Sequence, residues 1–151
     1  MRDRRFVAVH RGGPLKKEQH RQLMQWAFEC AMHIMPLTGE HTDHRLVHAL
    51  KVALAWQEGK ASVGEARRAS VEAHAAAREA TGHVAVAVAR SVGQAVATAH
   101  MADHSMGAAW YALKAVKSAG KPVGEEREWQ DAKLPVEIRN LVLTAREMKK
   151  I

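Results

Sequence analysis

The most apolar part of the chain is residues 82–120, where alanine and valine dominate and Arg90 is the only charged residue before Asp103. A helix that is apolar all round has no face for solvent and belongs inside a bundle. A single straight helix of this length would measure about 60 Å at roughly 1.5 Å per residue, twice the width of a domain of this size. Because Asp103 is a good helix N-cap, we predict two helices, over about 83–100 and 103–119.

Polar and apolar residues recur with a helical period over most of the remaining chain. Proline and glycine mark where these periodic stretches begin and end. The pattern predicts further helices at about 14–35, opening on Pro14, and at 43–58, 62–80, 125–132 and 135–148. We expect Leu54 and Met148 to face inward. No strand pattern is present, so the sequence predicts an all-α, single-domain bundle of six or seven helices, in which the central Ala/Val-rich helix at 84–99 is the most buried.

The helix predicted at 62–80 has the clearest start and an inner face of small side chains. Ser62 followed by Glu65 is a capping box, in which each side chain accepts a hydrogen bond from a backbone N–H near the other residue. The inner stripe consists of alanine alone, namely Ala66, Ala69, Ala73, Ala77 and Ala80. Such a stripe lets two helix axes approach to the short end of the usual range. A bulky side chain at Ala73 should therefore overpack the interface.

The first 13 residues show no sustained periodicity, and we expect an extended segment that packs on the bundle through Phe6 and Val9. This end of the chain is charged where a signal peptide needs an apolar run, and the lone cysteine, Cys30, has no partner for an internal disulfide. Arg90 interrupts the apolar run before it reaches the roughly 20 residues of a membrane span. We therefore expect a cytoplasmic protein with no membrane partner.

The net charge is +7, and most of it lies near the N-terminus, since residues 1–21 carry seven Lys or Arg residues against two carboxylates. Such an end suits an acidic partner. Arg4, Arg5 and Arg11 are our candidate contact residues, and a merely solubilising face is the alternative. The chain lacks a helix-turn-helix signal and aromatics interleaved with these basic residues. We therefore expect only weak, non-specific DNA binding that is lost by roughly 0.2 M salt.

Ten histidines make a metal site the first chemical possibility to test. His100 and His104 have the spacing with which two imidazoles on one helix meet one metal, and Asp103 and His74 are further candidate ligands. The predicted helix break falls at this point, however, so we expect His100 at a helix C-terminus and His104 in a hydrogen bond across the bundle. A second group, His41, His44 and His48, spans too great a length of helix. We predict no bound metal and no cofactor.

Catalytic patterns are also missing from the sequence. It contains no G-x-S-x-G turn, no glycine-rich phosphate loop, and no nucleophile with a base at a workable spacing, so we predict no enzyme. Arg90 is a charge in an apolar helix and needs either water or a partner, for which Glu65, Glu72, Asp103 and an external anion are the candidates. Among four tryptophans, Trp110 is our candidate anchor for a protein partner, and Arg90 is a further candidate contact residue.

Four stretches together resemble the bacterial and archaeal immunity proteins of polymorphic toxin systems. They are DRRFVAVHRGGPLKKEQHRQLMQWAFECAMHIMPL at 3–37, SVGEARRASVEAHAAAREA at 62–80, AVATAHMADHSMGAAWYALKAVKSAG at 95–120 and LPVEIRNLVL at 134–143. The resemblance implies an all-helical protein that binds and neutralises a cognate toxin without catalysis, and it carries over no catalytic residue. The basic end favours a toxin with an acidic surface. Two alternatives stay open: a self-associating structural or regulatory helical protein, and a metal-dependent or nucleic-acid-binding protein.

Overall fold

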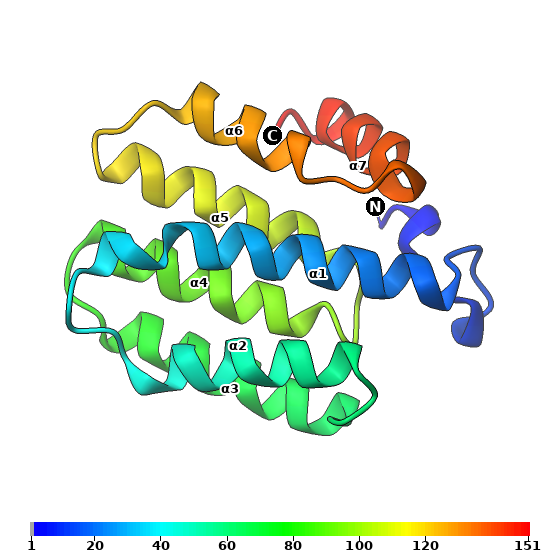
Figure 1. Cartoon of the computed structure of the whole chain (residues 1–151), viewed down its shortest axis with the longest axis horizontal. Helices are drawn as coiled ribbons and strands as arrows, with labels where there is room; N and C mark the ends of the chain where they lie inside the picture. The colour runs from blue at the N-terminus through cyan, green and yellow to red at the C-terminus, as the bar shows by residue number, and fades with distance from the viewer. Residues whose placement is uncertain (1) are drawn as a thin grey trace.

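The computed structural model describes residues 2–151, and these form an all-α domain without strands (Figure 1). Its helices are α1 (Lys17–Ile34), α2 (His44–Gln57), α3 (Val63–Glu79), α4 (His83–Ala97), α5 (His104–Ser118), α6 (Val123–Ala132) and α7 (Val136–Lys149). The predicted fold class is confirmed, and so is the break in the apolar region at residues 98–103. None of the described helices combines the length and the hydropathy needed to cross a membrane.

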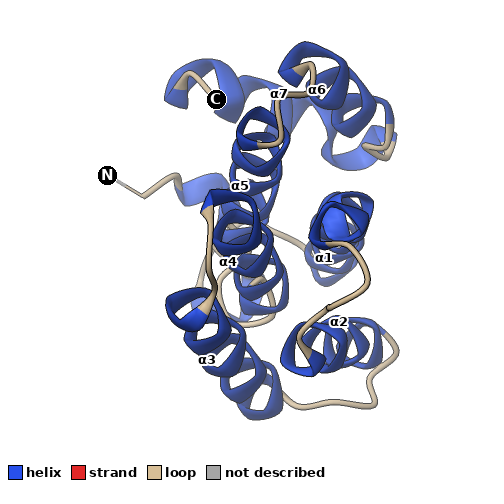
Figure 2. Cartoon of the chain, turned by 90° about the vertical axis from the view of Figure 1, so that its left-hand side faces the viewer, coloured by secondary structure: helices blue, strands red, loops and turns tan. Residues whose placement is uncertain are grey.

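Helix α4 occupies the centre of the bundle. It contacts α1, α2, α3 and α5, and Figure 2 shows it end-on with these four helices around it. Nine of its fifteen residues are buried, the largest share in any described helix. Helices α6 and α7 lie on the side of α5 that faces away from α2 and α3 (Figure 1). The prediction that residues 84–99 are the most buried part of the chain is confirmed.

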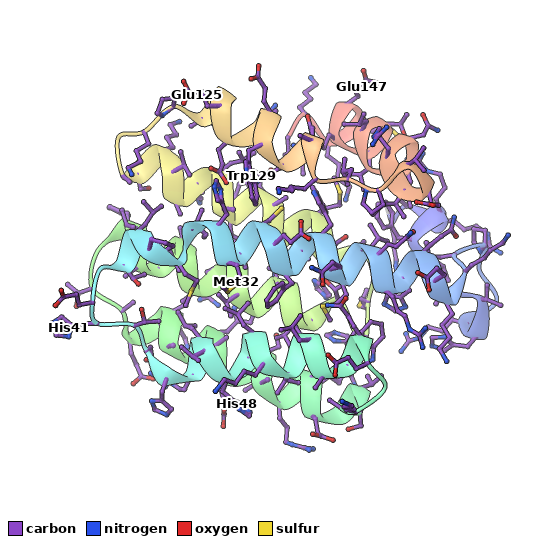
Figure 3. All side chains as sticks on the ribbon, in the orientation of Figure 1. Met32, His41, His48, Glu125, Trp129 and Glu147 are labelled. Atoms are coloured by element: carbon purple, nitrogen blue, oxygen red, sulfur yellow. The ribbon has the colours of Figure 1, made fainter. Side chains whose placement is uncertain are left out.

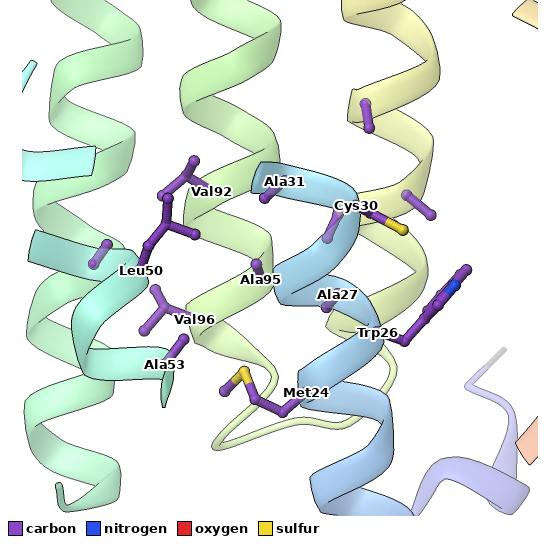
Figure 4. Close-up of a cluster of buried hydrophobic side chains, with 14 of the residues drawn as sticks. Met24, Trp26, Ala27, Cys30, Ala31, Leu50, Ala53, Val92, Ala95 and Val96 are labelled. Atoms are coloured by element: carbon purple, nitrogen blue, oxygen red, sulfur yellow. The ribbon is translucent and has the colours of Figure 1, made fainter. Parts of the chain in front are cut away.

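The core is built largely from small side chains. Figure 4 shows alanines of α1 and α4 packed beside Val92, Val96 and Leu50, with Trp26 as the one large ring at the edge of the cluster. The free thiol of Cys30 lies in the same cluster and is fully buried. Burial raises the pKa of this thiol well above its usual value. With so little side-chain volume between them, the helices are held close together.

Helix α3 begins at the predicted capping box. The N–H of Glu65 donates to Ser62 Oγ at 3.0 Å, and the N–H of Ser62 donates to Glu65 Oε1 at 3.2 Å. Its alanine stripe faces α2 and α4, and the first four members are buried, namely Ala66, Ala69, Ala73 and Ala77. Ala80 is half-buried and follows the last helical residue. Both local signals in this stretch were therefore interpreted correctly.

The N-terminal segment differs from the sequence prediction. Residues 4–6 and 9–11 form two 3₁₀ turns instead of an extended strand, and α1 begins at Lys17 instead of Pro14. The N–H of Leu15 donates to the carbonyl of Val7 at 3.0 Å, which holds this stretch outside the helix. Phe6 is buried as predicted, whereas Val9 is 57% exposed and the prediction for it was wrong.

Two other side chains predicted to face inward are exposed. Leu54 lies one position round α2 from the buried Ala53 and is 37% exposed. Met148 is 73% exposed because it lies in the last turn of α7, where the nearest group is the guanidinium of Arg5. Helical periodicity identifies a face, but the neighbouring helices decide how much of that face is covered.

Buried Gln130 attaches α6 to three other helices. Its Nε2 donates to the carbonyl of Ala109 on α5 at 3.1 Å, and its Oε1 accepts from Arg146 on α7. Its backbone carbonyl accepts from the indole of Trp26 on α1 at 2.8 Å. The Arg146 guanidinium also donates to Asp131 at 2.9 Å. These bonds satisfy polar groups that would otherwise be costly to bury.

Candidate partner-binding surface

Two of the three N-terminal candidate arginines are exposed. Arg4 and Arg11 are exposed, whereas Arg5 is engaged inside the molecule. Arg5 forms an ion pair of 2.7 Å with Asp3 and donates from Nη1 to Thr144 Oγ1 on α7 at 2.6 Å. Its bond to Asp3 holds the pKa of that carboxyl below its usual value. Arg5 thus fastens the N-terminal segment to α7 through a side chain that is still 39% exposed, and Arg4 and Arg11 are more exposed than Arg5.

A cavity of about 520 Å³ opens beside this basic end, between the N-terminal segment, the start of α1 and the loop between α2 and α3. Its apolar walls include Ala8, Leu15 and Trp56, and its basic side chains are His10, Lys17 and Arg21. The sequence analysis did not identify this cavity. The basic residues within 16–21 could have indicated its charged rim. The apolar walls could not be found in the same way, because they come from segments more than 40 positions apart.

His20 lies on the wall of this cavity and is only 5% exposed. Its Nε2 lies 2.6 Å from the carbonyl oxygen of Thr98, and because a carbonyl only accepts, Nε2 carries the proton. Burial lowers the pKa of the imidazole, so the ring is neutral at pH 7. Its Nδ1 is therefore an acceptor, and no hydrogen bond occupies it within the described residues. Trp56 packs against the ring with centroids 4.9 Å apart.

A second set of candidates lies in a row across α3, α4 and α5. Arg90 donates from Nη1 to Nδ1 of His74 at 2.8 Å, so its partner is an imidazole and not one of the predicted carboxylates. Glu65, Glu72 and Asp103 make no contact with it. The prediction considered only charged partners, whereas a neutral histidine on the adjacent helix supplies the acceptor. Burial and the charge of Arg90 lower the pKa of His74, in agreement with this role.

The other two histidines of the row lie at the start of α5 and just before it. His104 donates from Nδ1 to Gln94 Oε1 on α4 at 2.7 Å, so the predicted hydrogen bond across the bundle is confirmed. The His100 ring lies 5.1 Å from that of His104 and is tilted by 53°. His100 follows the end of α4, as expected, and its Nδ1 is buried without a hydrogen-bond partner.

These imidazoles do not converge on a common point. Nδ1 of His74 is taken by Arg90, and Nδ1 of His104 is taken by Gln94. Within residues 2–151, no group of three His, Cys, Asp or Glu side chains has the arrangement of a metal site. Figure 3 shows His41 beyond the end of the bundle and His48 outside α2, pointing to solvent at separate places. That the protein works without a metal or cofactor stays a prediction.

Two glycines make room for this polar row. A methyl group at Gly93 would lie 2.7 Å from the ring of His74, and one at Gly107 would lie 2.5 Å from Gln94 Oε1. Both distances are below those of real carbon contacts. The imidazole and the amide therefore rest directly on helix backbone, and this fixes where they present their remaining polar atoms.

Trp110 stands at the end of the row and is 37% exposed. Lys114 lies 4.7 Å above its ring and Tyr111 packs edge-on against it at 4.8 Å. Two shallow hollows of about 330 and 310 Å³ flank the indole. We call the residues around these hollows the Trp110 surface: Trp110, Lys114, Lys117, Arg127 and Lys149. An exposed aromatic among cations is typical of a protein-binding site.

His100 is expected to make the protein less stable in mild acid. Burial and the neighbouring His104 lower the pKa of His100 to about 4, and those of His20, His74 and His104 are also lowered. Between the unfolded pKa of about 6.5 and the folded value, the unfolded chain binds the proton more readily. The melting temperature should therefore be constant above pH 7 and fall from pH 6.5 to pH 5.

The variant His100→Gln tests this expectation by differential scanning calorimetry. It removes one of the four titrating groups, so its fall between pH 6.5 and pH 5 should be smaller than that of the wild type. The exposed His48 supplies the control, because His48→Gln should keep the wild-type slope. A His100→Gln profile parallel to the wild type would contradict the assignment.

Fold and side chains together define a small all-α protein whose notable surface features are a basic cavity and an exposed tryptophan among lysines. A family model described as "Imm-5 like putative immunity protein" matches residues 13–137, and the chain belongs to that family. This confirms the resemblance seen in the sequence. Comparisons with curated proteins and with solved structures found no match.

Proposed function

We propose that the protein neutralises a cognate toxin by binding it in a stoichiometric complex, without catalysing a reaction. The observation that carries the proposal is membership of an immunity-protein family over residues 13–137. The Trp110 surface and the cavity at the basic end support it, because each offers exposed contacts of the kind that protein interfaces use.

The toxin that this protein binds has an acidic surface. The chain carries a net charge of +7, and exposed cations surround both candidate contact regions. Complementary charge mainly accelerates association and excludes partners of like charge. Exposed Arg4 and Arg11 contribute to this attraction, whereas Arg5 acts within the molecule. Specific nucleic-acid binding forms no part of the proposal.

The test uses a toxin captured by this protein in a pull-down from the native host. The two proteins are mixed, and size-exclusion chromatography with light scattering measures the mass of the complex. A one-to-one complex is expected, with full loss of toxin activity at one equivalent. Protection by far less than one equivalent would indicate catalysis and contradict the proposal. A stable homo-oligomer that ignores the toxin would instead favour the self-associating alternative.

Trp110→Ala is expected to weaken this complex at least tenfold, or by about 1.4 kcal/mol, because aromatic anchors at the centre of an interface carry much of its energy. Isothermal titration calorimetry measures the change. Met32→Ala is the matched control, since Met32 is another exposed apolar side chain but lies on α1 and lines neither hollow (Figure 3). Equal affinities for Trp110→Ala and the wild type would exclude this surface from the interface.

A further inference from the structure

We infer that the cavity at the basic end receives an aromatic side chain that protrudes from an acidic segment of the partner protein. The inference rests on the proposed function and adds to it the place and the chemistry of one contact. Four independent features of the cavity support it: its size and apolar walls, the charges at its mouth, the start of α1, and the free acceptor on His20.

The interior of the cavity is apolar and large enough for one large side chain. Its volume of about 520 Å³ falls within the range of about 300–1,000 Å³ for ligand pockets. Leu15 and Trp56 form the walls, and Val9, which is more than half exposed, stands at the opening. An aromatic side chain inserted here would cover apolar surface that is now in water, which favours binding.

The rim of the cavity is basic. Lys17 and Arg21 lie four residues apart on the same face of α1, and His10 faces them from the N-terminal segment. No carboxylate lines the cavity within the described residues. Glu18 lies close to the rim, with its Oε2 3.9 Å from Arg21 Nη1 on a side chain that is 71% exposed. Because water screens the exposed Glu18 carboxylate, the rim still attracts an anionic segment.

The loop between α2 and α3, which forms one wall of the cavity, does not neutralise the positive charge of the rim. Glu58 and Lys60 flank Gly59 and pair with each other at 3.2 Å on exposed side chains, so they add no net charge. Gly59 has a φ of +74°, which only glycine adopts readily, and the N–H of Lys60 donates back to Ala55 at 2.8 Å. This helix ending turns the chain so that Ala61 lies in the cavity wall.

The start of α1 adds a further positive field. The N-cap position is held by Lys16, whose side chain has no acceptor for the N–H groups of the first turn. The Gln19 side chain accepts from the N–H of Lys16, outside the helix, at 2.9 Å. Uncapped N–H groups and the helix dipole favour an anion here, next to Lys17 and Arg21.

His20 favours an aromatic residue that carries a donor. His20 lines the cavity, and because its Nε2–H is fixed on Thr98, its Nδ1 lone pair is left as an acceptor. The hydroxyl of tyrosine and the indole N–H of tryptophan are donors carried on an apolar body. The partner chemistry is thus a tyrosine or tryptophan flanked by aspartate or glutamate.

The test is selection from a phage-displayed library of random dodecapeptides on the immobilised wild-type protein at about 0.15 M salt. We expect enrichment of peptides that carry an aromatic residue next to Asp or Glu. The enriched peptides, synthesised and labelled, are then titrated by fluorescence anisotropy. Failure to enrich any peptide, or enrichment of peptides without acidic residues, would overturn the inference.

Two variants locate the binding site. Ala61→Leu fills the cavity from the loop, and the double variant Lys17→Glu with Arg21→Gln replaces two positive charges of the rim by one negative charge. Each should weaken peptide binding at least tenfold, whereas Lys51→Glu, a charge reversal on an exposed lysine of α2 outside the cavity, should change it less than twofold. Circular dichroism confirms the fold of each variant. Undiminished binding to the rim variant would place the peptide elsewhere and overturn the inference.

The inference and the proposed function fail in different ways. If the two cavity variants bind the toxin as tightly as the wild type does, the cavity is not the contact and the inference falls, while the one-to-one complex stands. If the wild type forms no complex with the toxin, the proposed function falls, whatever the peptide selection gives. Weaker toxin binding by both cavity variants, together with acidic aromatic peptides, supports both.

Discussion

Gln130→Ala is expected to lower the free energy of unfolding by about 3 kcal/mol. Gln130 is 0% exposed, and its side chain is bonded to Ala109 and Arg146 on two different helices. Alanine would remove both bonds, leave the buried guanidinium with Asp131 as its one anionic partner, and open a small cavity. Urea denaturation followed by circular dichroism measures the loss.

The control for this variant lies on the same helix. Glu128 is exposed, so Glu128→Ala should change the free energy of unfolding by no more than about 0.5 kcal/mol. A loss below about 1 kcal/mol for Gln130→Ala would mean that water or a shifted side chain replaces its bonds. In that case the other bonds of α6, from the Trp26 indole to the carbonyl of residue 130 and from Arg146 to Asp131, would hold it to the bundle together with its apolar contacts.

Ala73→Leu is expected to destabilise the protein by about 2 kcal/mol through overpacking. Ala73 is fully buried where α3 meets α4, and the added carbons would have to separate the two helices or distort side chains. Leucine has nearly the helix propensity of alanine, so the change tests packing and not helix formation. Chemical denaturation gives the difference, with Glu72→Leu on the exposed side of α3 as the control. Unchanged or higher stability would show unfilled space at this interface.

The helices that the sequence predicted best are those with local signals. The capping box of Ser62 and Glu65 fixed the start of α3, and the polar residues around Asp103 marked the break between α4 and α5. In each case the residues that decide the boundary are within a few positions of it. The start of α1 was wrong because Leu15 is held by a bond to Val7, which no helical pattern contains.

The candidate surface was harder to predict because its parts come from distant segments. The cavity at the basic end brings Leu15 together with Trp56, and one of the hollows beside Trp110 brings Gln94 together with Lys149. Arg90 was recognised as a charge that needs a partner, but its acceptor is the uncharged His74. Spacing along the chain predicts which side of a helix is buried, whereas these pairs depend on how whole helices are placed.

Because Cys30 is buried, the reactivity of its thiol reports on motions that open the bundle. The sequence has one cysteine, it lies at the centre of the α1 interface, and burial raises its pKa. The thiolate is the nucleophile that attacks a thiol reagent, so Cys30 reacts only in molecules in which α1 has moved away from its neighbours. The rate of Cys30 modification then measures how often α1 opens. A lower rate in the presence of bound toxin would show that the complex restrains this helix.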